Sequence, residues 1–350
     1  MTPKERWRRT FQREPIDRVA LDYWGTPEIT TRLKLRLNCR DDRELWDRLG
    51  IDKSVGIGPA LHDPLADQRN GADVWGVRSR VIRYADGAGE YAEVCESPLS
   101  SAETVSDIEK FPWPDPGWWD HSSIENQCVS LNDYPIIGGT YEPFLLYCAM
   151  RGLEQGMADL VAAPEMVEAA LERIFHIHYV LIERTLAAAK GAVDFIYVAE
   201  DLGSQTGPLM SLDTFRRILK PGMAKMIELA HSHGAWAFHH DDGGIRPLLP
   251  DLMEIGIDLL NPIQWRCAGM DRRELKRDYG DRLVFHGAMD NQQTLPFGTI
   301  EEVRQEVRDN IQILGENGGY ILAPCHNLQV ITPLENIIAM YEEAHRVGGN

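Results

Sequence analysis

The second half of the chain alternates short apolar runs with longer segments of helical periodicity. Residues 193–199 form a nearly continuous run rich in β-branched and aromatic side chains, which is typical of a strand buried on both faces. Before this run, residues 164–189 have a helical pattern that Gly191 ends. Such a succession of strands and helices predicts parallel strands joined by right-handed crossovers. The other strand-like runs are 19–21, 135–139, 235–239, 257–261, 283–287 and 320–323.

Local signals place helices between these runs. Ser211 can cap a helix that stops at Pro221, and a further helix is expected over about 223–233. Residues 299–302, Thr-Ile-Glu-Glu, form a capping box that starts another helix. A terminal helix is expected to begin near Pro333.

Seven or eight strand–helix units predict an α/β protein with a (β/α)8 TIM barrel, and we expect residues 1–350 to form one such domain. A doubly wound open sheet is the alternative, but no Gly-x-Gly-x-x-Gly turn follows any predicted strand. Residues 40–120 contain short segments and the stretch 111–119, which is rich in proline and tryptophan. We expect this part to be an N-terminal cap or lid added to the barrel.

Composition limits the partners and the compartment. The net charge of −18 over 350 residues argues against a general affinity for nucleic acid or for an anionic membrane. The six cysteines form no Cys-x-x-Cys pair, which favours free thiols in a reducing compartment. The N-terminus lacks the apolar stretch of a signal peptide, and no segment has the length and apolarity to span a bilayer. We therefore expect a cytoplasmic protein that binds neither nucleic acid nor membrane, with room for a homodimer.

Polar and titratable side chains follow almost every predicted strand. In a barrel these strand ends meet at one mouth, where barrel enzymes hold their active sites. Each residue also has a structural alternative: Asp242 suits a helix N-cap, and Cys325 suits a buried small apolar position. The pattern as a whole predicts an active site built from Tyr141, Glu200, Asp201, residues 239–242, Asn261, residues 286–290 and residues 325–327.

A His-His-Asp-Asp quartet ends one of these strands. Because side chains alternate faces along a strand, His240 and Asp242 are expected on one face. His239 and Asp241 then take the other face, where His239 suits a structural hydrogen bond to a backbone carbonyl. A neutral imidazole, a carboxylate and the thiolate of Cys325 converging on one point would suit a divalent metal such as zinc.

The sequence around this quartet resembles the uroporphyrinogen decarboxylase-like superfamily. It is most similar to the branch that contains the cobamide-dependent methyltransferases, and the likeness covers nearly the whole chain. The resemblance implies a (β/α)8 barrel, in agreement with the strand pattern. The stretches that carry it are 14–19, 200–208, 238–252, 256–258, 261–264 and 319–327.

In that branch a His-x-Cys motif and a later cysteine commonly bind zinc. The resemblance puts His240 at the histidine position and Cys325 at the later cysteine, whereas Asp242 stands where the first cysteine would be. An aspartate can bind zinc through oxygen, although it is a harder ligand than a thiolate. Either a mixed nitrogen, oxygen and sulfur site holds zinc, with Glu200 as a further ligand, or the site has lost its metal.

The leading hypothesis is a zinc-dependent methyltransferase or demethylase. It would move a methyl group between a small methylated substrate and the corrinoid carried on a separate protein. Zinc would serve as a Lewis acid on the heteroatom that carries the methyl group. The side chains expected to take part in catalysis are Tyr141, Glu200, Asp201, Asn261, His286 and Asp290.

Two other functions stay open. The alternative enzyme is a uroporphyrinogen decarboxylase-type decarboxylase of tetrapyrrole metabolism. True decarboxylases have an arginine-rich signature, Arg-Gln-Ala-Gly-Arg, near the N-terminus, whereas residues 20–26 here contain no arginine. Without such cations a polyanionic porphyrinogen would bind poorly to an acidic protein. A third possibility is a barrel that only binds a tetrapyrrole or another small ligand.

Overall fold

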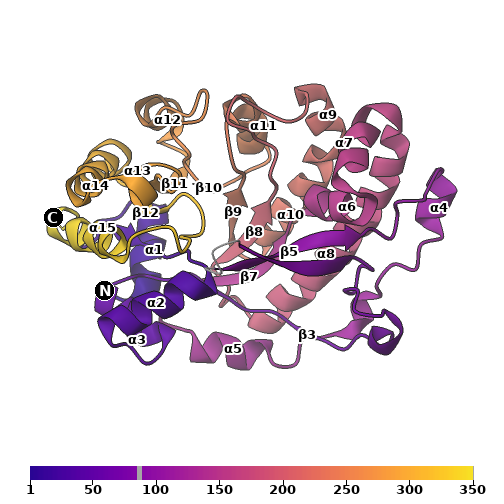
Figure 1. Cartoon of the computed structure of the whole chain (residues 1–350), viewed down its shortest axis with the longest axis horizontal. Helices are drawn as coiled ribbons and strands as arrows, with labels where there is room; N and C mark the ends of the chain where they lie inside the picture. Colours follow the sequence, from indigo (N-terminus) through magenta and orange to yellow (C-terminus); the bar gives the residue numbers. More distant parts are fainter. Residues whose placement is uncertain (85–88, 350) are drawn as a thin grey trace.

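A parallel sheet lies at the centre of the molecule, and helices surround it (Figure 1). The computed structural model describes residues 1–84 and 89–349. Within these residues the sheet has eight strands in the spatial order β1-β12-β11-β10-β9-β8-β7-β2. The strands are β1 (Ala20–Leu21), β2 (Val55–Gly56), β7 (Ile136–Tyr141), β8 (Phe195–Ala199), β9 (Trp236–His240), β10 (Leu259–Asn261), β11 (Val284–Met289) and β12 (Tyr320–Pro324).

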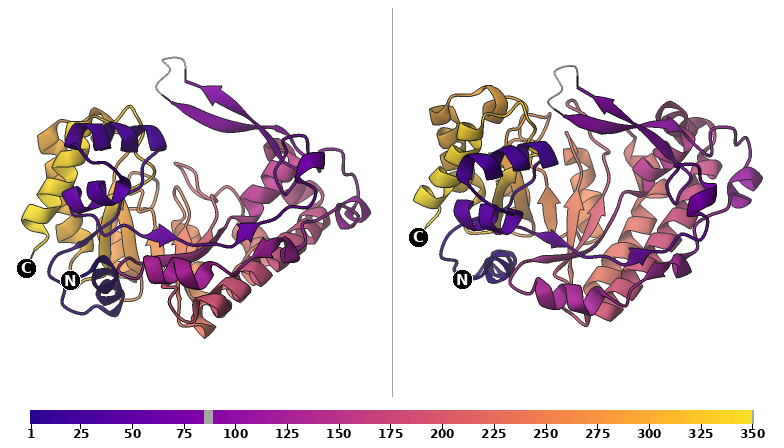
Figure 2. Two further views of the ribbon diagram at one scale, coloured as in Figure 1. Left: turned by 90° about the horizontal axis from the view of Figure 1, so that it is seen from below. Right: turned by 60° about the horizontal axis from the view of Figure 1, so that its bottom comes forward.

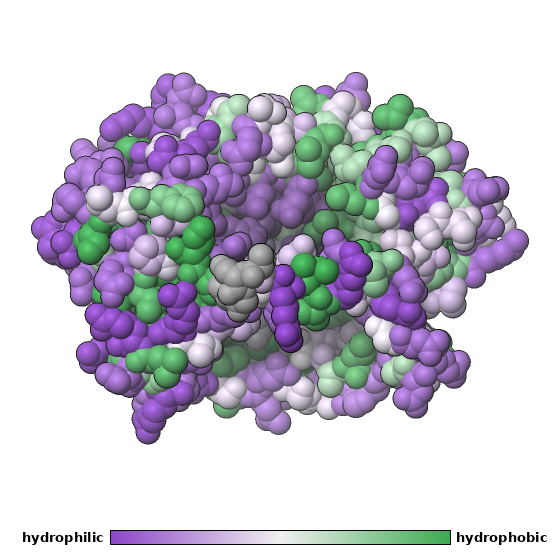
Figure 3. Space-filling view, viewed as in Figure 1, coloured by the Kyte–Doolittle hydropathy of each residue, from purple (hydrophilic) through white to green (hydrophobic). Residues whose placement is uncertain are grey.

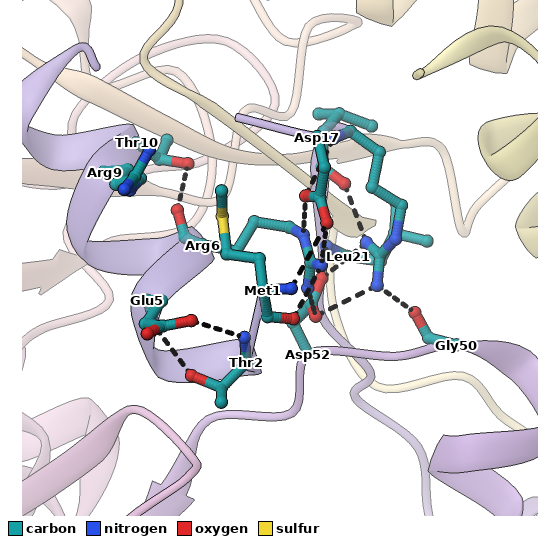
Figure 4. A network of polar contacts seen from close by, with 12 residues as sticks. Met1, Thr2, Glu5, Arg6, Arg9, Thr10, Asp17, Leu21, Gly50 and Asp52 are labelled. Carbon is teal, nitrogen blue, oxygen red and sulfur yellow. Dashed lines mark hydrogen bonds and ion pairs between the residues drawn. The ribbon is translucent and has the colours of Figure 1, made fainter. Parts of the chain in front are cut away.

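The first and last strands of this order meet at a seam. The Asp52 backbone N–H, just before β2, donates to Leu21 O of β1 at 2.6 Å, and the Asp52 carboxylate accepts from Leu21 N at 3.0 Å. Arg6 and Arg18 both donate to the same carboxylate, in the network that Figure 4 shows. The predicted α/β fold with a (β/α)8 barrel is therefore confirmed, and a charged cluster ties its shortest strands together.

Helices cover the outer face of the sheet. None of those in the described ranges has the length and apolarity needed to cross a membrane. They are α1 (Pro3–Gln12), α2 (Pro27–Leu37), α3 (Asp42–Leu49), α4 (Val105–Glu109), α5 (Ile124–Ser130), α6 (Pro143–Arg151), α7 (Leu153–Ala162), α8 (Pro164–Ala189), α9 (Leu212–Ile218), α10 (Lys220–Ser232), α11 (Leu249–Glu254), α12 (Arg272–Tyr279), α13 (Thr294–Phe297), α14 (Ile300–Leu314) and α15 (Leu334–Val347).

Aromatic side chains fill the amino-terminal end of the barrel. Trp7 of α1 packs against Phe195 of β8, with ring centroids 5.4 Å apart. Phe11, one turn later, stacks on Trp236 of β9 at 4.6 Å. These rings belong to an apolar cluster inside the barrel that is separate from the larger core between strands and helices. The base of the barrel is thus packed shut, and access is left to the opposite end.

The predicted elements agree with the structure in most places, and α8 has the expected bounds. The capping box at residues 299–302 is present at the start of α14. One boundary is wrong: α9 ends at Ile218, and α10 begins at Lys220, so Pro221 lies in the first turn of a new helix. Proline fits there because the first N–H groups of a helix have no acceptor within it.

Residues 40–120 are not wholly an addition to the barrel, because β2 lies among them. The same region forms an antiparallel hairpin of β4 (Arg78–Arg83) and β5 (Glu90–Glu96), and β3 (Ala60–Leu61) pairs with β6 (Trp119–Asp120). Figure 2 shows the hairpin projecting over the open end of the barrel. Its use as a lid stays a prediction, and residues 85–88, between β4 and β5 in the sequence, lie outside the described residues.

Candidate functional site

Three metal-binding side chains gather at the carboxyl end of the barrel strands. One ligand atom each from His240, Asp242 and His326 lies within 4.8 Å of the other two, and we name this group the mouth cluster. His240 ends β9 and is buried, whereas the Asp242 and His326 side chains are 27% and 40% exposed in the loops after β9 and β12. Figure 3 shows this face hollowed at its centre, with hydrophilic residues on the floor of the hollow. The cluster is therefore accessible from outside.

The other half of the quartet faces away from the mouth. His239 Nδ1 lies 2.8 Å from Val198 O, and His239 Nε2 lies 3.7 Å from Asp241 Oδ2. Asp241 Oδ1 accepts a hydrogen bond from Leu202 N at 2.7 Å. Both side chains are fully buried. The quartet therefore divides as strand alternation predicts, with the structural role for His239 on the outer face.

His240 is held by two aromatic rings and by a polar partner at each ring nitrogen. The rings of Trp24 and Tyr197 lie nearly parallel to the imidazole at 5.7 and 5.6 Å. Nδ1 is 2.5 Å from Asn261 Oδ1, and Nε2 is 3.5 Å from Asp201 Oδ1. Burial lowers the pKa of His240, but the bond to Asp201 and the other nearby carboxylates outweigh it and raise the pKa to about 9.

Three carboxylates close to His240 make the mouth acidic. The hydrogen bond from His240 lowers the pKa of Asp201. Burial raises the pKa of Asp242, and burial followed by the charge of Asp201 raises the pKa of Glu142. Such mutual repulsion is relieved by a bound cation, which is the usual reason that carboxylates converge at a metal site.

The mouth cluster fits a divalent metal such as zinc. Imidazole nitrogen and carboxylate oxygen are common zinc ligands, and in a tetrahedral site with bonds near 2.0 Å they lie roughly 3.4 Å apart. The observed separations need only small side-chain movements to reach that distance. Asp242 Oδ1 also accepts from Gln264 Nε2 at 3.1 Å, and Asn261 holds the second nitrogen of His240. We call such residues outer partners: they hydrogen-bond to a metal ligand without binding the metal, and they orient that ligand.

Cys325 is not part of the mouth cluster. Its thiol donates to Ile263 O at 3.3 Å, and burial raises its pKa well above the ordinary value, whereas a metal ligand needs the thiolate. Asp290, another residue predicted for the site, lies in the loop after β11, where its carboxylate accepts a hydrogen bond from Arg266 Nε at 2.5 Å. The structure thus presents His326, rather than its neighbour Cys325, beside the other two ligands.

Two further predicted residues face the helices instead of the mouth. Glu200 accepts from the backbone N–H groups of Phe144 and Leu145 at 2.8 and 3.3 Å, so it caps the start of α6. Tyr141 packs beneath α8, with its ring 5.9 Å from that of His178. The Tyr141 hydroxyl has no hydrogen-bond partner among residues 1–84 and 89–349. Neither side chain is brought to the mouth cluster.

Some residues at the site received no individual metal-binding or catalytic role from the sequence, although residues 325–327 were expected at the mouth. Asp22 and Trp24 follow β1 on the same face as Ala20, and Tyr197 points inward from β8, so strand alternation could have identified all three. His326 lies beyond the end of β12, where alternation no longer applies. The loop sets the direction of the His326 side chain, so only the structure shows that it faces the mouth.

Comparison with known proteins places the fold and the site in context. The sequence profile described as uroporphyrinogen decarboxylase (URO-D) matches residues 103–347. The methylcobamide:CoM methyltransferase MtaA of Methanosarcina barkeri is 28% identical over 212 residues, which are 59% of this chain and 57% of that protein. The chain therefore matches less than two thirds of the length of this relative.

Two more relatives extend the match. Uroporphyrinogen decarboxylase of Pseudoalteromonas translucida is 24% identical over 284 residues, or 75% of each chain. The solved structure of a methyltransferase from Methanosarcina mazei superposes with a TM-score of 0.66 and 20% identity over 99% of both chains, which shows a shared fold. With the profile covering more than half of its length, the chain belongs to the uroporphyrinogen decarboxylase family.

Proposed function

We propose that this protein is a zinc-dependent methyltransferase or demethylase that moves a methyl group between a small methylated substrate and a corrinoid protein. The observation that carries the proposal is the mouth cluster, which supplies a donor set for a metal at the open end of the barrel. Similarity to a methylcobamide:CoM methyltransferase supports the reaction class. Zinc on His240, Asp242 and His326 would supply Lewis acidity to the heteroatom of the substrate.

The surrounding residues have separate roles in this proposal. Trp24 and Tyr197 clamp the His240 ring, which keeps its Nε2 directed at the mouth. Asp201 is partly exposed, and with zinc on His240 Nε2 its carboxylate would be released from that ring and could accept a proton from a thiol or hydroxyl substrate. The hollow in Figure 3 leaves space above these groups for the substrate and for the docking of a corrinoid protein.

A decarboxylase is the second candidate, because a curated uroporphyrinogen decarboxylase also matches the chain. The charges at the mouth oppose it. Glu142, Asp201 and Asp242 would repel a substrate with many carboxylates, and residues 20–26 offer no arginine to neutralise it. Methyl transfer to or from a neutral or thiol substrate suits this mouth better.

Anaerobic assays can separate the two candidates. Protein purified without chelator is expected to hold about one zinc ion per chain. It is expected to demethylate methylcobalamin in the presence of a small thiol, followed by absorbance, and to lose this activity on chelation and regain it with zinc. Metal-free protein with full methyl transfer would contradict the zinc mechanism. Release of carbon dioxide from uroporphyrinogen would favour the decarboxylase.

A further inference from the structure

A chain of side-chain hydrogen bonds crosses the barrel interior from Asp22 to His240. Asp22 Oδ2 lies 3.2 Å from His286 Nε2. His286 Nδ1 lies 2.7 Å from Asn261 Nδ2, and Asn261 Oδ1 lies 2.5 Å from His240 Nδ1. Asp22, His286 and Asn261 are fully buried, so bulk solvent does not reach these bonds.

Asp22 is fixed at the start of this chain as an acceptor. Its Oδ1 accepts from Ser54 N at 3.2 Å, and its Oδ2 accepts from Ser54 Oγ at 2.8 Å and from Trp24 Nε1 at 3.0 Å. Lys53 Nζ lies 3.6 Å from Oδ1. Burial raises the pKa of Asp22, but Lys53 and the bond from His286 outweigh it and hold this pKa well below its usual range. The group is therefore a carboxylate, which cannot donate.

The direction of every later bond follows from this acceptor. Because Asp22 only accepts, His286 must carry a hydrogen on Nε2. The amide nitrogen of Asn261 only donates, so His286 Nδ1 must carry the lone pair, and the ring is neutral. Burial lowers the pKa of His286, in agreement with a neutral ring. The amide oxygen of Asn261 then faces His240 Nδ1, which must donate.

We propose that Asp22 is a positioning residue that acts through His286 and Asn261 to keep a hydrogen on His240 Nδ1. The only nitrogen of His240 left to bind a ligand is then Nε2, which faces Asp201 and the mouth cluster. The carboxylate that sets this tautomer lies three side chains away from the open mouth. The identity of the ligand as a metal rests on the proposed function, whereas the direction of the hydrogen bonds does not.

The wild-type protein provides the first test. Histidine labelled with 15N in the ring gives long-range 1H–15N spectra that distinguish the two neutral tautomers. In metal-free protein near neutral pH, His286 is expected to have its hydrogen on Nε2, and the spectrum of His286→Gln assigns the signal. A His286 with its hydrogen on Nδ1 would overturn the proposal without any variant of Asp22.

Asp22→Asn tests the action at a distance. The amide oxygen is expected to keep the backbone donors of Tyr23 and Ser54 at Oδ1, which leaves the NH2 group facing His286 Nε2 and Trp24 Nε1. His286 should then change to the tautomer with its hydrogen on Nδ1, and the Asn261 amide should turn over. Zinc affinity is expected to fall by about 10- to 100-fold, as for other outer partners of metal ligands. Turnover should fall by about 10- to 100-fold as well, the usual effect of losing such a partner.

Ser54→Ala is the matched control, because it removes a donor to the same carboxylate and leaves the carboxylate itself. It is expected to keep the wild-type His286 tautomer and zinc affinity. An Asp22→Asn protein with the wild-type tautomer and affinity would refute the positioning role. A wild-type protein that binds no zinc would refute the proposed function instead, and the tautomers would still report on Asp22.

Discussion

Two histidine–aspartate pairs lie one residue apart in the sequence and have opposite surroundings. His239 and Asp241 are fully buried behind β9 and bond to backbone groups of neighbouring segments. His240 and Asp242 face the mouth and lie beside His326. The same residue types therefore stabilise the fold on one face of the strand and present ligand atoms to the mouth on the other. The face of the strand on which a residue lies, rather than its residue type, therefore decides whether its side chain stabilises the fold or can bind a ligand at the mouth.

The largest effect is expected from the inner histidine. His240→Ala removes the buried member of the mouth cluster, so bound zinc should be lost, and methyl transfer should fall by more than about 100-fold, beyond the effect of an outer partner. Metal analysis and the methylcobalamin assay measure the two losses. Zinc at the wild-type stoichiometry in folded His240→Ala would break the distinction between the two pairs.

Substitution of the outer histidine, His239, is expected to lower stability and to leave zinc binding unchanged. His239→Ala leaves a cavity and removes the bond to Val198 O, so the free energy of unfolding should fall by about 2 kcal/mol. Chemical denaturation measures this change. The folded fraction should keep its zinc and its activity, since His239 does not reach the mouth. Loss of metal without loss of stability would show that the outer pair belongs to the site.

The pH dependence of zinc binding tests the charge on His240. Its pKa of about 9 means that zinc must displace a proton at neutral pH. Affinity measured by chelator competition should rise about tenfold per pH unit and level off near pH 9. In metal-free protein this raised pKa stabilises the fold fully below the ordinary value of 6.5, and the contribution is lost as the pH rises through 9. An affinity independent of pH from 7 to 9 would show that His240 is neutral.

The smallest effect is expected at Glu200, which the sequence placed in the active site. Burial raises the pKa of Glu200 well above its ordinary value, so the neutral Glu200→Gln side chain resembles the native group. The cap on α6 should weaken by about 1 kcal/mol, and kcat/KM should stay at the wild-type value. A loss of activity beyond tenfold in a stably folded variant would restore the catalytic role.

Much of the barrel was predictable because its central strands, β7 to β12, have three to six residues each and consist mainly of buried apolar side chains. Strand β2 was missed because it has only two residues, both at least partly exposed, and is held through the charged cluster around Asp52. Helix α12 gave little signal either, since Leu275 is its single buried residue. Elements held by polar contacts have no apolar periodicity to detect.

The site was predictable only as far as strand alternation reaches. It correctly divided the quartet, because His240 still belongs to β9. After Pro324, at the end of β12, the chain enters a loop, and no periodicity tells which of Cys325 and His326 faces the mouth. The family resemblance favoured the cysteine. The structure turns that thiol to Ile263 O and leaves the imidazole beside the cluster.

The central claim is that the mouth cluster holds the metal through two imidazoles and one carboxylate. The most direct test is the zinc content of Cys325→Ala and His326→Ala, measured by mass spectrometry on protein purified without chelator. We predict that Cys325→Ala keeps the zinc of the wild type and that His326→Ala loses most of it. Loss of zinc from Cys325→Ala, together with its retention in His326→Ala, would contradict the account and make the thiolate the third ligand.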